Sequence, residues 1–130
     1  MIEPRRPISE DSSPVARHAD SFTMDLPLET AVDVCRAALM AGNWKVMNTD
    51  GRNFLVKEQF GLFAMLLSYP SRAAILLRDH SDSETQVDLH GSIFGFGPLQ
   101  TRRVRAALMR LRGDIERAAS AAKAEAEAGA

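Results

Sequence analysis

Residues 85–122 constrain the fold of this chain most strongly, because the hydrophobic period changes within them. Apolar and polar residues alternate up to Ile93, which is the period-2 pattern of a half-buried strand. After Pro98 the apolar residues recur at spacings of three and four and form one helical stripe, namely Val104, Leu108, Leu111, Ile115 and Ala118. Gly95 and Gly97 give the backbone freedom to turn, and Pro98 suits a first helical position. The pattern predicts a strand that turns sharply into a helix folded back over its own sheet.

The rest of the chain supplies four more strands and one more helix. Alternation predicts a first strand, and an Asp-Gly pair between two short apolar-polar runs is typical of a hairpin. A second hairpin is expected around the polar turn at residues 80–84. The strands are expected at residues 21–26, 44–48, 53–59, 72–79 and 85–93, and the first helix at residues 29–41.

These elements predict an α+β fold, a two-layer sandwich of a five-stranded, mostly antiparallel sheet with both helices on one face. The order is β-α-β-β-β-β-α, with a short apolar helix or turn between the third and fourth strands. The first strand is expected to pair with the fifth, because the first helix carries the chain across the sheet. Residues 1–20 are expected to form a flexible tail, residues 21–122 a single domain, and residues 123–130 a fraying end.

The composition excludes several classes of protein. A formal net charge of -1 and a pI near 6.3 give no global field that would favour nucleic acid, so we expect no nucleic-acid partner. The single cysteine, Cys35, permits no internal disulfide and favours a reducing compartment. We expect no transmembrane segment, because no apolar run is long enough, and no signal peptide, because the first residues lack an apolar region. A cytoplasmic location is therefore expected.

The residues that carry chemistry do not form a catalytic or metal-binding pattern. No nucleophile and base can be paired, so we assign no catalytic residue and favour a non-enzymatic role. His18, His80 and His90 lack the further ligands that a metal needs, and we expect no metal or cofactor. The turn at residues 95–97 lacks the third glycine or the Gly-Lys-Ser/Thr ending of a nucleotide loop.

The last helix is rich in arginine outside its apolar stripe. Arg102 and Arg103 near its start are candidates for holding an anion, although glycine and proline already explain the turn there. The full set forms a basic ridge of Arg102, Arg103, Arg105, Arg110, Arg112 and Arg117. This ridge is either a solvated face or a surface for phosphates, acidic lipid headgroups or an acidic protein.

Large apolar side chains are expected on the inner surface between the sheet and the last helix. They either fill a solid core or leave an apolar pocket, the commonest form of ligand site. The candidate pocket residues are Trp44, Phe54, Ile75, Leu89, Phe94, Phe96 and Leu108.

Residues 60–70 are apolar on nearly every side, so their period does not separate a short helix from a strand. They form either a buried cap on the core or an exposed lip, and an exposed apolar lip marks a binding surface. As a lip they would serve a homodimer or another protein partner through Phe60, Leu62, Phe63, Leu66 and Tyr69.

The element order over residues 21–122 resembles a shortened helix-grip fold, the architecture of START and polyketide-cyclase-like proteins. The resemblance implies that apolar ligands are held between the sheet and the carboxy-terminal helix. This chain differs in having fewer strands and a single helix between its first two strands, and no functional residue carries over. A second resemblance is to small secretion-chaperone-like domains, in which a helix between two hairpins supports dimerisation.

Two functional hypotheses follow. The first is a non-enzymatic domain that binds a small apolar or amphipathic ligand between the sheet and the last helix. The alternative is a protein–protein interaction or chaperone-like module that uses the apolar surface of residues 60–69.

Overall fold

A computed structural model describes residues 15–59, 70–95 and 97–129 of the chain. Its elements are β1 (Val15–Met24), α2 (Leu28–Ala41), β2 (Trp44–Thr49), β3 (Asn53–Glu58), β4 (Arg72–Ser81), β5 (Glu84–Phe94) and α4 (Pro98–Ala128). The strands form a five-stranded sheet in the order β1-β5-β4-β3-β2, and neighbouring strands are antiparallel. The predicted fold class and the predicted pairing of β1 with β5 are confirmed. The short helix or turn expected between β3 and β4 lies outside the described residues.

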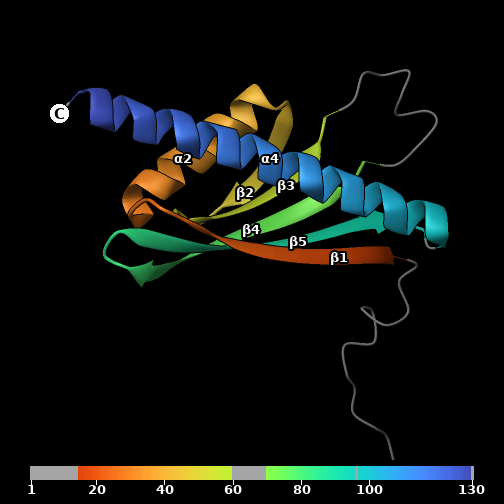
Figure 1. The fold of residues 1–130 in the computed structure, drawn as a ribbon. Helices are drawn as coiled ribbons and strands as arrows, with labels where there is room; N and C mark the ends of the chain where they lie inside the picture. Colours follow the sequence, from red (N-terminus) through yellow and green to blue (C-terminus); the bar gives the residue numbers. More distant parts are fainter. Residues whose placement is uncertain (1–14, 60–69, 96, 130) are drawn as a thin grey trace, which may run out of the picture.

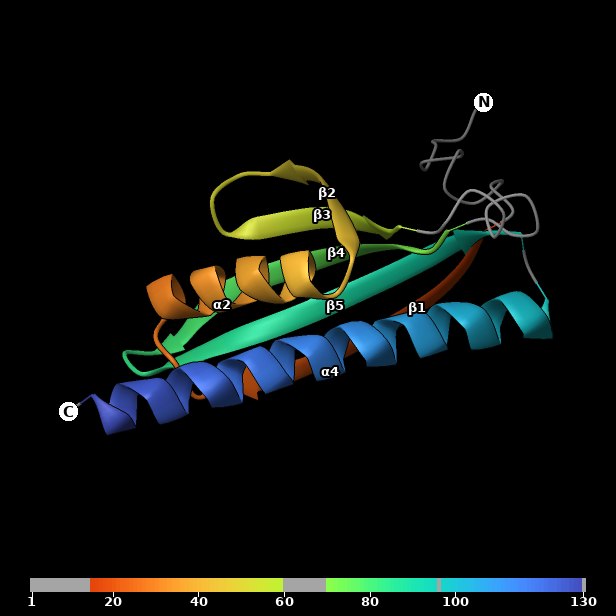
Figure 2. The ribbon, with the colours of Figure 1, turned by 90° about the horizontal axis from the view of Figure 1, so that it is seen from above.

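Both helices cover the same face of the sheet (Figure 1). The long helix α4 packs over β1 and β5, and α2 lies beside it over the remaining strands (Figure 2). Strand alternation explains this arrangement, because the buried apolar residues of β3, β4 and β5 occupy alternate positions and so lie on one face of the sheet. The helices pack on this face because each has one apolar stripe that must be buried.

The core lies between the sheet and the two helices. Its fully buried side chains come from every layer and include Leu39, Val56, Ile75, Val87, Leu89, Leu108, Leu111 and Ile115. Cys35 is also fully buried on α2, and this burial raises the pKa of its thiol to about 12. A thiol with such a pKa stays protonated at neutral pH, so Cys35 acts as a small apolar core residue.

The largest differences from the predicted boundaries are at the start of β1 and the end of α4. Strand β1 begins at Val15 rather than at Ser21, because the backbone from Val15 onward pairs with β5 down from Phe94. Within this extension Ala16 is buried. Helix α4 continues to Ala128, beyond the expected boundary at residue 122. In both places backbone hydrogen bonding continues an element whose side chains are small or polar and give little hydrophobic signal.

Helix α4 meets the sheet directly over Gly91 of β5. A Cβ atom added at Gly91 would lie 3.0 Å from Cδ1 of Leu108 and 3.1 Å from Cγ2 of Val104. Real Cβ atoms rarely approach other side chains so closely, so a side chain at this position would require Leu108 and Val104 to shift by a few tenths of an ångström. The missing side chain thus brings the amino-terminal half of α4 into direct contact with the strand.

Candidate functional site

The structure gathers most of the predicted pocket residues into the solid part of the core. Trp44, Phe54, Ile75, Leu89 and Leu108 all belong to one buried cluster. Their side chains are 0–5% exposed, so they pack against one another and their neighbours.

Two of the predicted pocket residues are not part of this cluster. Phe94 is 51% exposed, because it follows the buried Ile93 and so points to the opposite face of β5. Phe96 lies outside the described residues, as do all the residues proposed for the interaction surface at 60–69. Of the two arginines proposed for an anion, Arg102 is exposed and Arg103 is half-buried.

Trp44 is held by polar partners at the edge of this cluster. Its ring nitrogen Nε1 donates a hydrogen bond to Oδ2 of Asp114 at 3.4 Å. The Arg110 guanidinium stacks over the indole with its Cζ 4.7 Å from the ring centroid, and its Nη2 lies 3.5 Å from Oε2 of Glu58. Glu58 also accepts a hydrogen bond from the backbone N–H of Ser71 at 3.0 Å. The arginine therefore covers one face of the indole, and Trp44 is only 5% exposed.

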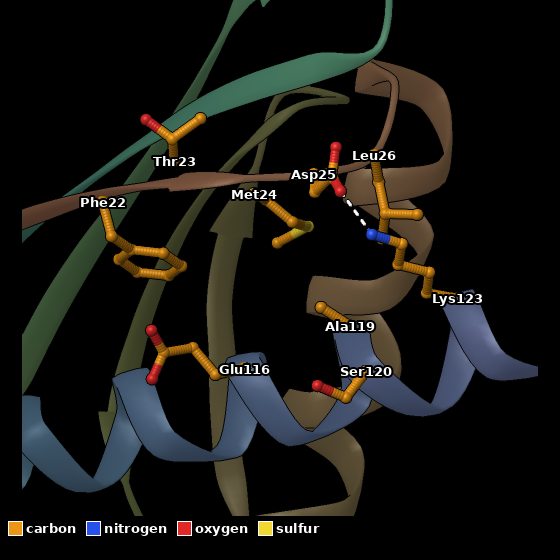
Figure 3. A pocket seen from close by; sticks show the side chains of 9 residues that line it. All are labelled: Phe22, Thr23, Met24, Asp25, Leu26, Glu116, Ala119, Ser120 and Lys123. Atoms are coloured by element: carbon orange, nitrogen blue, oxygen red, sulfur yellow. Dashed lines mark hydrogen bonds and ion pairs between the residues drawn. The ribbon is translucent and has the colours of Figure 1, made fainter.

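A cavity of about 340 Å³ lies elsewhere, between β1 and the carboxy-terminal half of α4 (Figure 3). Its lining comes from the end of β1, the turn that follows, and three turns of α4: Phe22, Thr23, Met24, Asp25, Leu26, Glu116, Ala119, Ser120 and Lys123. The space exists because the inner stripe of α4 changes from large residues, ending at Ile115, to Ala118, Ala119 and Ala122. Small side chains leave the edge of the sheet uncovered.

The lining is apolar at depth and polar at the surface. Met24 and Leu26 are buried, with 3% and 9% of their surface exposed. The charged groups of Glu116 and Lys123 are half-exposed, with 50% and 49% of their side-chain surface in solvent. A cavity with an apolar floor and charged groups at its mouth suits a molecule that has both an apolar body and a polar head.

A buried hydrogen bond fixes the wall of the cavity. The hydroxyl Oγ1 of Thr85 on β5 donates to the backbone carbonyl of Leu26 at 2.9 Å. Thr85 is fully buried, so this bond holds the chain between β1 and α2 against the sheet. The positions of Asp25 and Leu26 in the cavity wall follow from it.

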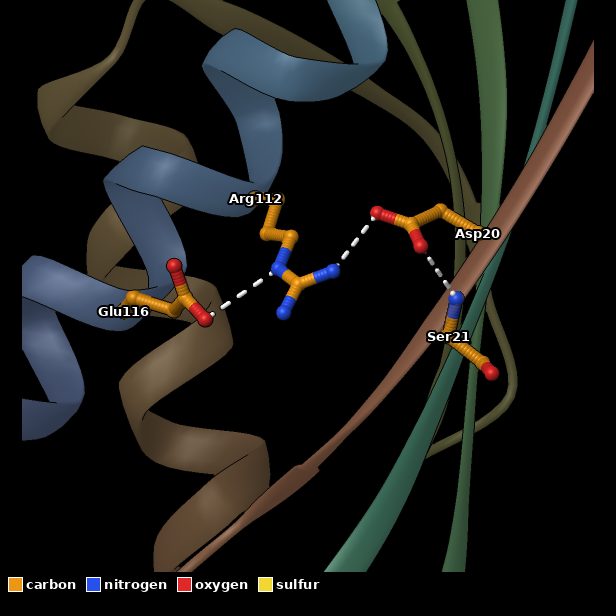
Figure 4. A network of polar contacts seen from close by, with 4 residues as sticks. All are labelled: Asp20, Ser21, Arg112 and Glu116. Carbon is orange, nitrogen blue, oxygen red and sulfur yellow. Dashed lines mark hydrogen bonds and ion pairs between the residues drawn. The ribbon is translucent and has the colours of Figure 1, made fainter.

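Ion pairs join α4 to β1 and to the turn after it. The ammonium of Lys123 pairs with the carboxylate of Asp25, which raises the pKa of Lys123 (Figure 3). The Arg112 guanidinium donates from Nη1 to Oδ2 of Asp20 at 2.9 Å and from Nε to Oε2 of Glu116 at 3.1 Å (Figure 4). Arg112 also lies over the ring of Phe22, 4.8 Å from its centroid.

The contact with Arg112 has an electrostatic consequence for the strand. Its hydrogen bond to the carboxylate holds the pKa of Asp20 below the usual value of 3.8, against the opposing effect of desolvation. Asp20 therefore stays ionised at neutral pH and keeps the α4–β1 contact charged. Among the described residues, no group of three or more His, Cys, Asp or Glu side chains is placed to hold a metal.

Sequence reasoning missed this cavity. Its candidate pocket residues did not include Phe22 or Met24, and it placed Lys123 in a fraying end. The available signal was the change from large to small residues along the inner stripe of α4 after Ile115. This change in side-chain size indicates where the helix leaves space. The opposite wall of the cavity is formed by the end of β1, whose position relative to α4 is not given by a local pattern.

The architecture is that of the helix-grip fold, in which a curved antiparallel sheet faces a long carboxy-terminal helix. This finding confirms the resemblance inferred from the element order.

No protein-family model and no curated protein matches the sequence. None of the helices in the described part of the chain has the length and apolar character needed to cross a membrane.

Solved structures of the same architecture resemble the chain at low sequence identity. A protein from Nitrosospira multiformis is 13% identical with a TM-score of 0.54, over 76% of this chain and 92% of that one. Ara h 8.0201 is 8% identical with a TM-score of 0.52, over 82% of this chain and 99% of that one. Norcoclaurine synthase from Thalictrum flavum, solved with dopamine and hydroxybenzaldehyde, is 10% identical with a TM-score of 0.52, over 90% and 93%. Identities this low establish the fold alone.

Proposed function

We propose that this chain is a non-enzymatic binding domain for a small amphipathic molecule, which it holds between the sheet and α4. The observation that carries the proposal is the cavity of about 340 Å³ between β1 and the carboxy-terminal half of α4. Ligand pockets in proteins span roughly 300–1,000 Å³, so this cavity suits a ligand at the small end of that range.

The lining indicates how such a ligand is oriented. Its apolar body lies against Phe22, Met24 and Leu26, where it removes apolar surface from water. Its polar head remains at the mouth, within reach of Lys123 and Glu116. Because the mouth carries both signs of charge, the head can be a cation or an anion, and both are tested below.

The fold supports a binding role. The structurally similar norcoclaurine synthase was solved with two small organic molecules, so a chain of this architecture accommodates such ligands.

We also infer a cytoplasmic location, which the single cysteine supports because Cys35 is buried and unpaired.

A titration followed by two-dimensional NMR tests the proposal, with decanoate and decylamine as probes of opposite head charge. At least one probe should produce saturable shifts at Met24, Ala119 and Ser120. The variant Ala119→Trp should fill the cavity and abolish these shifts. Ala121→Trp is the matched control, since Ala121 is exposed on the same helix.

Two outcomes would overturn this function. In the first, neither probe produces saturable shifts. In the second, Ala119→Trp binds as well as the unmodified chain does, which would place the probe elsewhere. Circular dichroism spectra of both variants should match the unmodified chain, so that a loss of binding is not a loss of fold.

A further inference from the structure

The charges of α4 are strongly segregated along its length. Residues 98–112 contain five arginines and no acidic residue. Residues 113–128 contain four acidic residues against Arg117 and Lys123. The chain as a whole carries a formal charge of only -1, so one end of this helix is a local concentration of positive charge.

The same part of α4 carries a second apolar stripe on its outer side. Leu99 and Met109 are 65% and 62% exposed, which is unusual for large apolar residues in the middle of an arginine-rich surface. Together with Arg102 and Ala106 they follow one another at helical spacings of three and four. This stripe lies opposite the inner stripe that packs on the sheet.

Two of the arginines on this outer face form no ion pair with the residues that the structure describes. Arg110 is paired with Glu58, and Arg112 is paired with Asp20 and Glu116. Arg102 and Arg105 are exposed, and within the described part of the chain neither forms an ion pair. Their charges are therefore available to an anionic partner.

The end of β5 is fixed to the start of α4. The side-chain amide of Gln100 donates a hydrogen bond to the carbonyl of Phe94, which ties the strand to the first turn of α4. The strand end and the helix start therefore lie at the same end of the molecule (Figure 2). The Phe94 side chain points to the opposite face of the sheet, so it is not part of the outer face of α4.

We propose that the outer face of residues 98–112 docks on the surface of an anionic lipid bilayer. Arg102 and Arg105 contact the lipid headgroups, and Leu99 and Met109 enter the boundary between headgroups and acyl chains. Helices that lie in this interface combine arginines on one side with large apolar residues that are buried in lipid. A segment of 15 residues gives a contact about 22 Å long.

A bilayer fits these observations better than a nucleic acid does. Phosphates of nucleic acid would satisfy Arg102 and Arg105, but they offer nothing to exposed Leu99 and Met109. Lipid satisfies both kinds of side chain. The proposal is independent of the cavity, whose lining residues belong to the other half of the helix.

Flotation with vesicles tests the proposal on the full chain. We expect binding to phosphatidylcholine vesicles that contain about 30% phosphatidylserine, weak binding to pure phosphatidylcholine, and release at high salt. Each arginine near an anionic surface contributes about fivefold to the affinity, so Arg102→Glu with Arg105→Glu should weaken binding by about 25-fold or more. Lys45→Glu with Arg52→Glu is the control, because it makes the same change of net charge at exposed residues of the β2–β3 hairpin.

A second variant separates a bilayer from a purely electrostatic partner. Leu99→Gln with Met109→Gln leaves the charge unchanged and should weaken vesicle binding by about tenfold, since two large apolar side chains no longer enter the lipid. Binding to a DNA duplex should be weaker than binding to the vesicles. The proposal is overturned if the unmodified chain does not float with phosphatidylserine vesicles. It is overturned equally if this variant binds them unchanged, or if duplex DNA binds more tightly.

Discussion

The two halves of α4 meet the same sheet in different ways. In the amino-terminal half, Val104 and Leu108 press directly on Gly91, and the helix–sheet boundary is filled. In the carboxy-terminal half, the inner residues are alanines, and a cavity opens between the helix and β1. An ion pair between Lys123 and Asp25 joins this second half to the chain after β1.

The comparison shows that the size of the inward side chains decides where a helix encloses space. Both halves belong to one continuous helix over one continuous sheet, so the backbone geometry is similar along the contact. Large residues against glycine leave no volume, whereas alanines against a strand edge leave room for a ligand. A fold of this type can therefore be closed at one end and open at the other.

The variant with the largest expected effect is Leu108→Ala, which tests the closed half. Leu108 is 2% exposed and packs on Gly91, so its truncation leaves a cavity in a filled region. We expect a loss of about 3 kcal/mol in the free energy of unfolding, measured by urea denaturation. Ser120→Ala in the open half is the control and should change stability by less than about 0.5 kcal/mol. A loss below about 1 kcal/mol for Leu108→Ala would show that this half is not tightly packed.

Gly91→Val tests the same contact from the side of the sheet. The backbone at Gly91 has no positive φ, so any cost comes from the clash with Leu108 and Val104 rather than from strain of the backbone. We expect a loss of about 2 kcal/mol in the free energy of unfolding. Ser92→Val, one residue further on the opposite face of β5, should be nearly neutral in the same urea experiment. A neutral Gly91→Val would mean that α4 moves away from the sheet at little cost.

The closed half was largely predictable from the sequence. The spacing of Val104, Leu108 and Leu111 gave the inner stripe, and the alternation around Leu89 gave the inner face of β5. Both are local patterns, and most neighbouring strands in the sheet are also neighbours in the chain; the exception is β1 with β5, which are separated in the chain by α2 and three strands. The pocket prediction put large residues where the structure packs them together, because periodicity gives the face of an element and not its distance from the next layer.

The open half depends on contacts that no local pattern encodes. Lys123 and Asp25 are separated by 98 positions in the chain, and they meet only because α4 continues to Ala128 and passes the end of β1. At Phe94, in contrast, the local pattern was sufficient and the pocket assignment was wrong for another reason. Alternation from Ile93 places it on the outer face, where the structure has it, and its aromatic character made it a pocket candidate.

The pH dependence of stability tests the contact between α4 and β1 that Arg112 and Asp20 form. Arg112 lowers the pKa of Asp20 in the folded chain below 3.8, so this contribution is present above about pH 3.8 and is lost as the pH falls through the folded pKa. Asp20 is about a third exposed, at 32%, so the contact has the strength of a surface ion pair. We expect Asp20→Asn to cost about 0.5–1 kcal/mol at pH 7 and to flatten the acid limb of the stability curve.

Asp33→Asn is the control for this effect, since Asp33 pairs with the neighbouring Arg36 on the surface of α2 and is 79% exposed. Its stability at pH 7 should remain within about 0.5 kcal/mol of the unmodified chain. Urea denaturation at several pH values measures both variants. If the free energy of unfolding of Asp20→Asn depends on pH in the same way as that of the unmodified chain, the Arg112–Asp20 contact does not stabilise the packing of α4 on β1.

The smallest effect on stability, and the clearest test of the open half, is expected for Ala119→Leu. The larger side chain enters the cavity and meets no packed neighbour, so we expect a change of less than about 0.5 kcal/mol, or a slight gain from cavity filling. The same change in a filled core would cost about 1–3 kcal/mol, so the stability measurement alone distinguishes an open half from a closed one. Ala121→Leu, exposed on the same helix, controls for the change in helix propensity. Decanoate or decylamine binding should fall at least tenfold in Ala119→Leu and remain unchanged in Ala121→Leu, because only the first occupies the volume that the ligand needs.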